Sequence, residues 1–219
     1  LCLNGKFNLP ELKKFFGHDV CVQNDANCFA LAEALLGAGK GYKNVFGVII
    51  GTGCGGGIVF DGHVLTGPQS IAGEWGHNPL PWPQPDELPG PPCYCGKTGC
   101  IENWISGPAV AAYHRRVTGQ VMAAPDIFAA AESGHLDALA TRARLIDRTA
   151  RSLATVINLL DPDHIVLGGG LSNVPRLAED VAAQLPAWVF SNRVDTVLVR
   201  NRHGDSSGVR GAAWLWPVA

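Results

Sequence analysis

Three cysteines lie within eight residues in the middle of the chain. Cys93, Cys95 and Cys100 are separated by glycines that let the backbone wrap around a cation, and His77 stands a short way before them. Structural zinc takes four tetrahedral ligands, and three cysteines with one histidine are a common set. Three reduced cysteines in a loop are the alternative, but this spacing is typical of metal binding in a reducing compartment. The sequence therefore predicts a structural Zn²⁺ bound by His77, Cys93, Cys95 and Cys100.

A second kind of chemistry could come from carboxylates. Asp25 follows Asn24 at a predicted strand-to-helix junction, where a carboxylate is held rigidly enough to accept a proton from a hydroxyl group. The alternative for Asp25 is a helix N-cap, which its position alone favours. Glu74 and Glu102 lie on either side of the cysteine cluster and could accept hydrogen bonds from adjacent hydroxyls of a sugar. Taken singly, each of these two is typical of a surface carboxylate.

Glycines dominate residues 51–57 (GTGCGGG). Gly51, Gly53 and Gly56 satisfy the dinucleotide-binding pattern G-x-G-x-x-G, which requires a helix to follow. Because the next residues predict a strand, we reject that interpretation. A glycine-rich turn between two strands can still direct backbone N–H groups, with the Thr52 hydroxyl, at phosphate oxygens. A tight hairpin with bulges is an equally good alternative.

Two further glycine segments are candidates for nucleotide contacts. Residues 96–98 (GKT) fit the end of a Walker A loop, but the first glycine of that loop would fall on Pro91, so the interpretation fails. Residues 168–170 (GGG) follow a predicted buried strand, and their backbone could approach an adenine or a ribose closely. A simple turn is the alternative at this position.

The elements that must position these residues alternate between strand and helix, which is typical of an α/β protein. Periodicity and capping residues predict strands at 19–22, 45–50, 58–60, 164–167 and 196–199, and helices at 27–36, from 106, at 138–160, after 175 and at 207–216. The proline-rich residues 78–92 predict a long ordered loop. Arg144, Arg148 and Arg151 share one face of the 138–160 helix, which we expect to be solvated.

The composition excludes several classes of function. Hydrophobic residues make up 47% of the chain, charged residues 16%, and the net charge is -2, which is typical of a globular protein. No long basic stretch is present, so we expect neither a nucleic acid nor a membrane as partner. The longest apolar run, residues 45–60, is too short to span a bilayer and is broken by glycines. Together with reduced cysteines, these features predict a cytoplasmic protein.

The order of the motifs along the chain is highly specific. Residues 24–27 (NDAN), 51–57 (GTGCGGG), 73–77 (GEWGH), 93–102 (CYCGKTGCIE) and 167–170 (LGGG) together resemble the ROK family of sugar kinases and repressors. The resemblance implies an α/β fold of the actin-like, ribonuclease-H-like ATPase type, with two domains and a cleft between them. It also implies transfer of the γ-phosphoryl group of ATP, bound with Mg²⁺, to the hydroxymethyl group of a hexose.

The resemblance also implies roles for the residues that match the family's motifs. Asp25 is expected to be the general base that accepts the proton of the sugar hydroxyl. Contacts to the sugar are expected from Asn24, Asp25, Glu74, His77 and Glu102. Contacts to ATP are expected from Thr52, Gly53, Gly169 and Gly170. The zinc ligands match His77, Cys93, Cys95 and Cys100, and the partners are then a hexose, ATP and a second copy in a homodimer.

Two segments bear on the substrate. Residues 73–82 and 203–217 are most similar to bacterial fructokinases, also called mannofructokinases, so fructose is the expected substrate and fructose 6-phosphate the product. N-acetylglucosamine kinases and glucokinases of the same family are the alternative, because a few hydroxyl contacts decide between hexoses.

The family's N-terminal Asp-x-Gly-x-Thr phosphate loop has no counterpart in the sequence. We therefore expect residues 1–24 to be a remnant of a first domain that is largely missing. Residues 25–206 would form a nearly complete second domain with the zinc-stabilised loop, and residues 207–219 a C-terminal helix that returns to the first domain. Because the resemblance implies that this aspartate organises Mg²⁺, a non-catalytic sugar-binding module or an inactive fragment is a further alternative.

Overall fold

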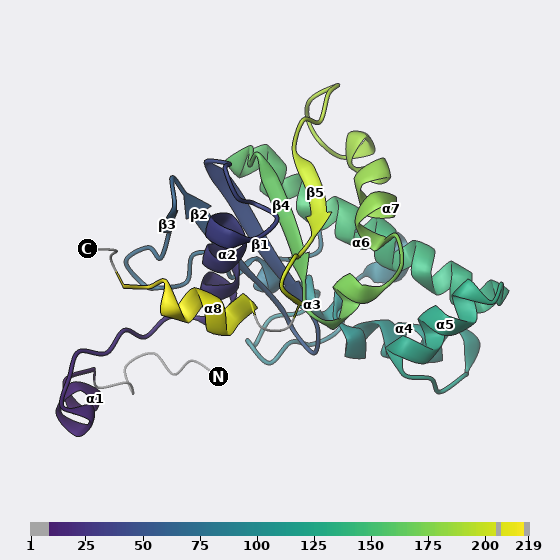
Figure 1. The fold of residues 1–219 in the computed structure, drawn as a ribbon. Helices are drawn as coiled ribbons and strands as arrows, with labels where there is room; N and C mark the ends of the chain where they lie inside the picture. The colour runs from purple at the N-terminus through teal and green to yellow at the C-terminus, as the bar shows by residue number, and fades with distance from the viewer. Residues whose placement is uncertain (1–8, 205–206, 217–219) are drawn as a thin grey trace.

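A mixed β-sheet lies at the centre of the molecule (Figure 1). The computed structural model describes residues 9–204 and 207–216. The strands in these residues are β1 (Asn44–Ile50), β2 (Cys54–Phe60), β3 (His63–Val64), β4 (His164–Gly168) and β5 (Val197–Arg200). They lie in the order β3-β2-β1-β4-β5. The β3-β2-β1 part is antiparallel and the β1-β4-β5 part is parallel. The strand β1 therefore pairs with an antiparallel neighbour, β2, on one side and with a parallel neighbour, β4, on the other.

One face of the sheet packs against α2 (Asp25–Leu36). Side chains alternate between the two faces of a strand, and Val45 and Val59 point to this side. Glycines on the same face let the helix approach closely, because a Cβ on Gly47 would lie 2.7 Å from the Cβ of Ala30. The small apolar residues of α2 are therefore matched to the glycines of the sheet, and the helix that carries Asp25 is fixed against it.

The opposite face carries the larger core. Phe46, Val48, Ile165 and Leu167 alternate with the residues of the first face and pack against the helices that follow the hairpin (Figure 1). These helices are α3 (Glu102–Ile105), α4 (Gly107–Thr118), α5 (Ala124–Glu132), α6 (Leu136–Leu160) and α7 (Leu177–Gln184). Short 3-10 helices are η1 (Trp75–His77), η2 (Pro85–Glu87), η3 (Gly170–Asn173) and η4 (Leu185–Ala187). The core thus places α3, next to the cysteine cluster, under the end of the β1–β2 hairpin.

Most of the predicted elements are confirmed, and one is wrong. The Ser106 side chain caps α4 as predicted, accepting a hydrogen bond from the N–H of Ala109 (3.4 Å). The long helix ends at Leu160, before Asp161 and Pro162. Residues 19–22 form no strand. They connect α1 (Leu9–Phe16) to α2, and the five-stranded sheet forms without them.

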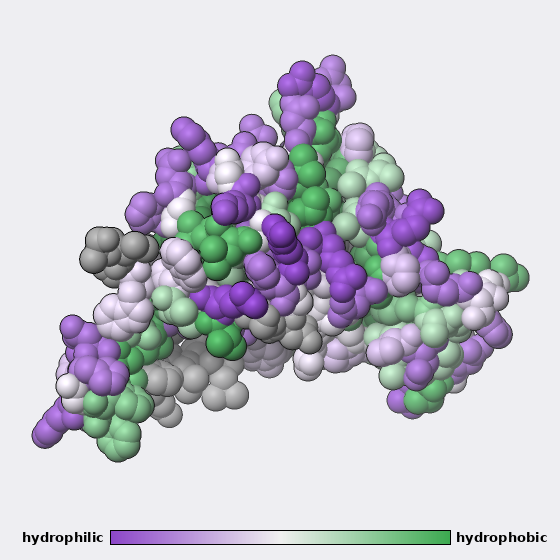
Figure 2. All heavy atoms as spheres, in the orientation of Figure 1, coloured by the Kyte–Doolittle hydropathy of each residue, from purple (hydrophilic) through white to green (hydrophobic). Residues whose placement is uncertain are grey.

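The helices at the two ends of the described chain differ in how they pack. The helix α1 (Leu9–Phe16) buries no residue and stands apart from the sheet in Figure 1, and Figure 2 shows apolar side chains over it. Its Phe15 is 82% exposed. The helix α8 (Ser207–Ala213) packs across α2 instead, with Gly211 against the backbone of Cys28. The remaining residues of the predicted terminal segments, 1–8 and 217–219, lie outside the described residues, and the domain boundaries at 24 and 206 stay predictions.

A buried carboxylate fastens α8 to α2. Glu33 is 0% exposed, and its oxygens accept hydrogen bonds from the Ser207 hydroxyl (2.7 Å) and from the N–H groups of Ala38 (3.0 Å) and Arg202 (3.1 Å). A carboxylate this deep requires such donors, since an unpaired buried charge is very costly. In the described residues, no helix combines the length and apolar character that crossing a bilayer requires.

Candidate functional site

The turn that joins β1 to β2 forms the centre of the site. Residues 51–53 make this turn, and the N–H of Cys54 donates a hydrogen bond to Oε2 of Glu102 (2.9 Å). Gly53 leaves room for that carboxylate, because a Cβ there would lie 2.7 Å from Oε2 of Glu102. The turn and the first residue of α3 are therefore in direct contact. The rejection of the dinucleotide pattern is confirmed, since a strand and not a helix follows the turn, and this strand, β2, begins at Cys54, earlier than the expected residue 58.

Asp25 is the first residue of α2 and does not cap it. The cap is Asn24, whose Oδ1 accepts hydrogen bonds from the N–H groups of Ala26 (2.8 Å) and Asn27 (3.3 Å). The side chain of Asp25 is exposed. The first turn of α2 lies against β2, because a Cβ on Gly55 would touch that of Ala26 at 3.4 Å. The N-cap alternative for Asp25 is therefore wrong, and its carboxylate lies exposed at the first turn of the helix.

The four predicted metal ligands come together. The ligand atoms of His77, Cys93, Cys95 and Cys100 all lie within 4.8 Å of one another. Two thiols, those of Cys95 and Cys100, are 3.6 Å apart, and Cys93 Sγ lies 3.5 Å from His77 Nδ1. Two sulfur ligands on one tetrahedral zinc stand ~3.8 Å apart, given Zn–S bonds of about 2.3 Å. The residues present thus fit a four-coordinate zinc ion.

The electrostatics of the cluster agree with a cation between the thiols. Burial, followed by the neighbouring Cys95 and Cys93, raises the pKa of Cys100 to about 12 when no cation is present. The N–H of Lys97, by contrast, leads the effects that lower the pKa of Cys95. Three thiolates would repel one another in this volume, and a divalent cation would remove that repulsion.

Tyr94 was not singled out from the sequence. Its hydroxyl is 2.8 Å from Nε2 of His77, which leaves Nδ1 of the same ring facing the thiols. A partner on the second ring nitrogen fixes the orientation of a metal-binding histidine. Burial, followed by the negative charge of Glu102, raises the pKa of the Tyr94 hydroxyl.

Glu74 is placed by the segment around it. It is exposed and directly precedes η1, and its carbonyl oxygen accepts a hydrogen bond from the N–H of His77 (3.2 Å). The next residue, Trp75, is buried and donates a hydrogen bond from Nε1 to the carbonyl oxygen of Gly55 (3.0 Å). The segment of Glu74 and His77 is therefore anchored to β2 through Trp75. Glu102 is bound to the same strand, through the N–H of its first residue, Cys54.

A large cavity borders the glycine turn. Its volume is about 790 Å³, and it lies between the turn, the starts of α4 and α5, and η3. Thr52 and Gly170 line it, as do the apolar Ala111, Phe128 and Leu171. Gly53 and Gly169, the other two predicted nucleotide contacts, are the chain neighbours of these lining residues. Gly169 has a φ of +78° beside the carbonyl of Ile50, a conformation that favours glycine.

The arginines of α6 contradict the prediction that their shared face is solvated. Arg148 and Arg151 are 1% and 0% exposed, and Arg144 is partly buried. All three point at Glu87, a residue of the proline-rich loop that sequence reasoning did not single out. The shared face follows from the spacing, because residues at i, i+4 and i+7 lie on one side of a helix, but nothing local in the sequence shows that a carboxylate 61 residues away packs against it.

Comparison with known proteins identifies the family. The family model described as "ROK family" matches residues 8–219. The N-acetyl-D-glucosamine kinase of Shigella flexneri serotype 5b is 40% identical over 216 residues, which cover 97% of this chain and 71% of that kinase.

Two solved structures are also similar. The ROK hexokinase from Thermus thermophilus has a TM-score of 0.82 at 31% identity, over 92% of this chain and 66% of that chain. The ROK family glucokinase from Streptomyces griseus, solved with glucose and AMPPNP, has a TM-score of 0.80 at 30% identity, over 94% of this chain and 70% of that chain. The chain thus spans roughly 66–71% of the length of these relatives. Together with the mixed sheet and its covering helices, these matches show that the chain belongs to the ROK family and has the actin-like α/β fold of its sugar kinases.

Proposed function

We propose that this chain carries the sugar site and much of the nucleotide site of an ATP-dependent hexose kinase. One observation carries the proposal. The hydrogen bond from Cys54 to Glu102 joins the glycine turn to α3, and Thr52 of the same turn lines the 790 Å³ cavity, so Glu102 and the cavity both border this turn. A phosphoryl-transfer enzyme needs this arrangement, because its main task is to position an acceptor hydroxyl next to a γ-phosphate.

The proposed sugar contacts are Asn24, Asp25, Glu74, His77 and Glu102. Glu74, His77 and Glu102 are held to β2, and Asp25 begins the helix that packs on the same strand. Carboxylates accept hydrogen bonds from adjacent hydroxyls, which orients a hexose and leaves its hydroxymethyl group to be aligned. Asp25 then accepts the proton of that hydroxyl as its oxygen attacks the γ-phosphorus.

The proposed nucleotide contacts are Thr52, Gly53, Gly169 and Gly170. The largely apolar cavity suits an adenine and a ribose, while the turn offers backbone N–H groups and the Thr52 hydroxyl to phosphate oxygens. Mg²⁺ bound with ATP would neutralise charge on the transferred phosphoryl group.

Zinc has a structural role in this proposal. The four ligands fill a tetrahedral coordination sphere and leave no position for a substrate. Since His77 and Cys93 lie on either side of the proline-rich loop, the metal would fix that loop and, through it, the sugar contacts.

Two hexoses are candidates for the substrate. Fructose is our first proposal, from the likeness of residues 73–82 and 203–217 to fructokinases. The 40% identity to an N-acetyl-D-glucosamine kinase supports that sugar as the second. A coupled ADP-release assay with fructose, mannose, glucose and N-acetylglucosamine side by side decides between them. A preference for fructose supports the first proposal, and a preference for the acetylated sugar replaces it. Absence of ADP release with all four would favour a sugar-binding module without turnover.

A further inference from the structure

A single carboxylate in the proline-rich loop (residues 78–92) is surrounded by arginines. Glu87 is 2% exposed and ends η2. Its oxygens accept hydrogen bonds from Nε of Arg148 (2.8 Å) and from Nη2 of Arg151 (3.0 Å), and Arg144 lies 3.0 Å away. Burial alone would raise the pKa of Glu87, but the Gln84 N–H and the arginines outweigh it, and the pKa lies below its ordinary value. Glu87 is therefore an ionised group inside the fold.

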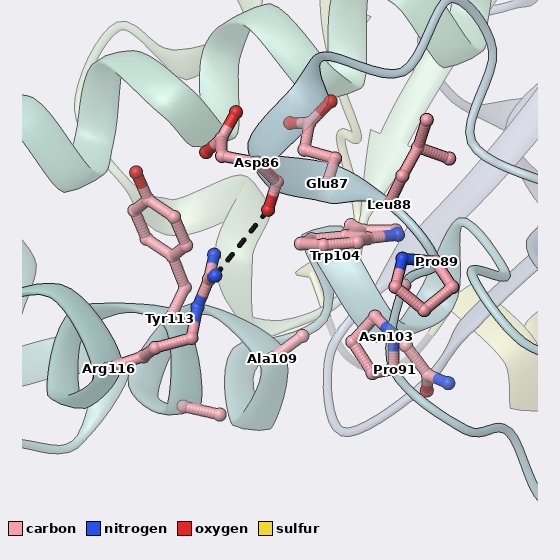
Figure 3. Close-up of a pocket in the computed structure, with 12 residues that line it drawn as sticks. Asp86, Glu87, Leu88, Pro89, Pro91, Asn103, Trp104, Ala109, Tyr113 and Arg116 are labelled. Atoms are coloured by element: carbon pink, nitrogen blue, oxygen red, sulfur yellow. Dashed lines mark hydrogen bonds between the residues drawn. The ribbon is translucent and has the colours of Figure 1, made fainter.

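The same arginines bind other parts of the loop. Nη1 of Arg151 donates to the carbonyl oxygens of Pro81 (2.9 Å) and Trp82 (2.8 Å), and Arg144 pairs with Asp86 (2.7 Å). In Figure 3 the side chains of Asp86 and Glu87 extend towards the neighbouring helix, away from Trp104 beneath them. The loop between His77 and Cys93 is thus fastened to α6 by side-chain and backbone bonds.

Arg148 also connects this loop to α3. Its guanidinium lies 4.6 Å from the ring centre of Trp104 and 4.2 Å from that of Tyr113, so it is in contact with two aromatic rings. Trp104 is 5% exposed and forms the floor of a pocket of about 280 Å³ beside the loop (Figure 3). It is two residues from Glu102 in the same single-turn helix. A shift of Trp104 therefore moves the backbone that carries Glu102.

We propose that Glu87 and Arg148 are positioning residues of the hexose kinase reaction, which hold Glu102 and His77 in place by locking the proline-rich loop and α3 to α6. The inference rests on the proposed function. A contribution to folding stability does not by itself explain this cluster of buried charges, because replacing a buried ion pair with apolar residues of similar volume often leaves the stability unchanged. What apolar residues lack is the directional bonding that fixes three elements relative to one another.

The test compares two arginines of α6. Arg148→Met removes the link between Glu87 and Trp104. Arg142→Met is the matched control, because Arg142 also forms two ion pairs, with Glu132 and Asp180 (both 2.8 Å), but contacts neither the loop nor α3 in the structure. Arg148→Lys keeps the charge and serves if the methionine variant fails to fold. Each protein is assayed for its KM for the hexose and for ATP, and for amide hydrogen exchange in residues 101–106.

We expect Arg148→Met to raise the hexose KM or to lower kcat by about tenfold or more, with the ATP KM nearly unchanged and with faster exchange in residues 101–106. Arg148→Lys should show the same changes to a smaller extent, and Arg142→Met should change neither the hexose KM nor that exchange. Equal effects of the two methionine variants, or no effect of Arg148→Met on exchange and hexose KM, would overturn the inference. If the unaltered protein phosphorylates no hexose, the proposed function fails, while the exchange comparison still tests the mechanical link.

Discussion

The carboxylate of Glu102 accepts a hydrogen bond from the N–H of Cys54, which lies 48 residues earlier in the chain. This bond joins the single-turn helix α3 to the glycine turn of the β1–β2 hairpin. Burial, followed by the nearby charge of Glu102, holds the pKa of the Cys54 thiol well above its ordinary value. The thiol therefore stays protonated at neutral pH, so the Cys54 residue serves the site through its backbone.

The substitution Gly53→Ala should displace the carboxylate of Glu102. The new Cβ would lie 2.7 Å from Oε2 of Glu102, so the carboxylate must move. We expect Gly53→Ala to lower kcat/KM for the hexose by about 10- to 100-fold, as misplaced contacts do. The control is Gly55→Ala, whose Cβ would meet that of Ala26 at an ordinary 3.4 Å. Steady-state kinetics of both variants check the prediction, and similar kinetics for the two would contradict it.

Asp25→Asn should abolish turnover and leave the fold intact. The helix cap is Asn24, so α2 keeps its N-terminal hydrogen bonds when Asp25 is replaced. An amide cannot accept the hydroxyl proton, and we expect kcat to fall by about 10²- to 10⁴-fold. Hexose binding, measured by calorimetry, should weaken far less. A proportional loss of binding and rate would mean that Asp25 positions the sugar and does not act as the base.

Loss of one thiol should release the metal. Cys95→Ser removes one of four ligand atoms that lie within 4.8 Å of one another, and we expect zinc content to fall from about one ion per chain to near zero. Cys21→Ser is the matched control, since Cys21 is exposed and outside the cluster. Mass spectrometry of metals checks both variants, and hexose affinity should fall only in the first. Equal zinc in the two proteins would remove the assignment.

The sequence was sufficient to predict the parts of the site that are local in the chain. The strand–turn–strand around residues 51–53, the helix behind Asp25 and the cysteine cluster each occupy a short segment, so spacing and turn chemistry determine them. The buried face of α6 could not be found this way. Glu87 and Arg148 are 61 residues apart in the chain. The residues around an arginine in the sequence do not show whether it forms an ion pair with a distant carboxylate or is solvated.

The failed strand at 19–22 has a similar cause. A β-branched stretch pairs only if a strand edge is open beside it, and that depends on the order of strands in the sheet. The position of Tyr94 also depends on a contact that is not local, because its partner His77 is 17 residues away in the chain. Its hydroxyl contacts His77, a residue placed there by a different segment.

Acid should destabilise the protein partly through Glu87. Its pKa in the folded state lies below the ordinary 4.5, so ionised Glu87 stabilises the fold above that pH and this contribution is lost as pH falls through the lower, folded-state value. Glu87→Gln should be less stable at pH 7, by about 3–5 kcal/mol, because it leaves buried arginines unpaired. Its stability should also depend less on pH below 4.5 than that of the unaltered protein.

Chemical denaturation from pH 3 to pH 7 measures both effects of the Glu87 variant. Asp86→Asn is the control from the same turn, where the carboxylate is 53% exposed and pairs with Arg144 alone among the described side chains. We expect a change of no more than about 1 kcal/mol for this exposed pair. Parallel pH profiles for the unaltered protein and Glu87→Gln would show that Glu87 is not the ionised centre of the cluster.

The most direct test of the account is to detect the phosphorylated sugar itself. The protein and its Asp25→Asn variant are incubated with ATP, Mg²⁺ and each hexose, and the products are followed by ³¹P NMR. We expect a hexose 6-phosphate signal that grows with the unaltered protein and is absent or far slower with Asp25→Asn at matched hexose saturation. A protein that binds a hexose but produces no phosphorylated sugar, or a variant as fast as the unaltered protein, would contradict it.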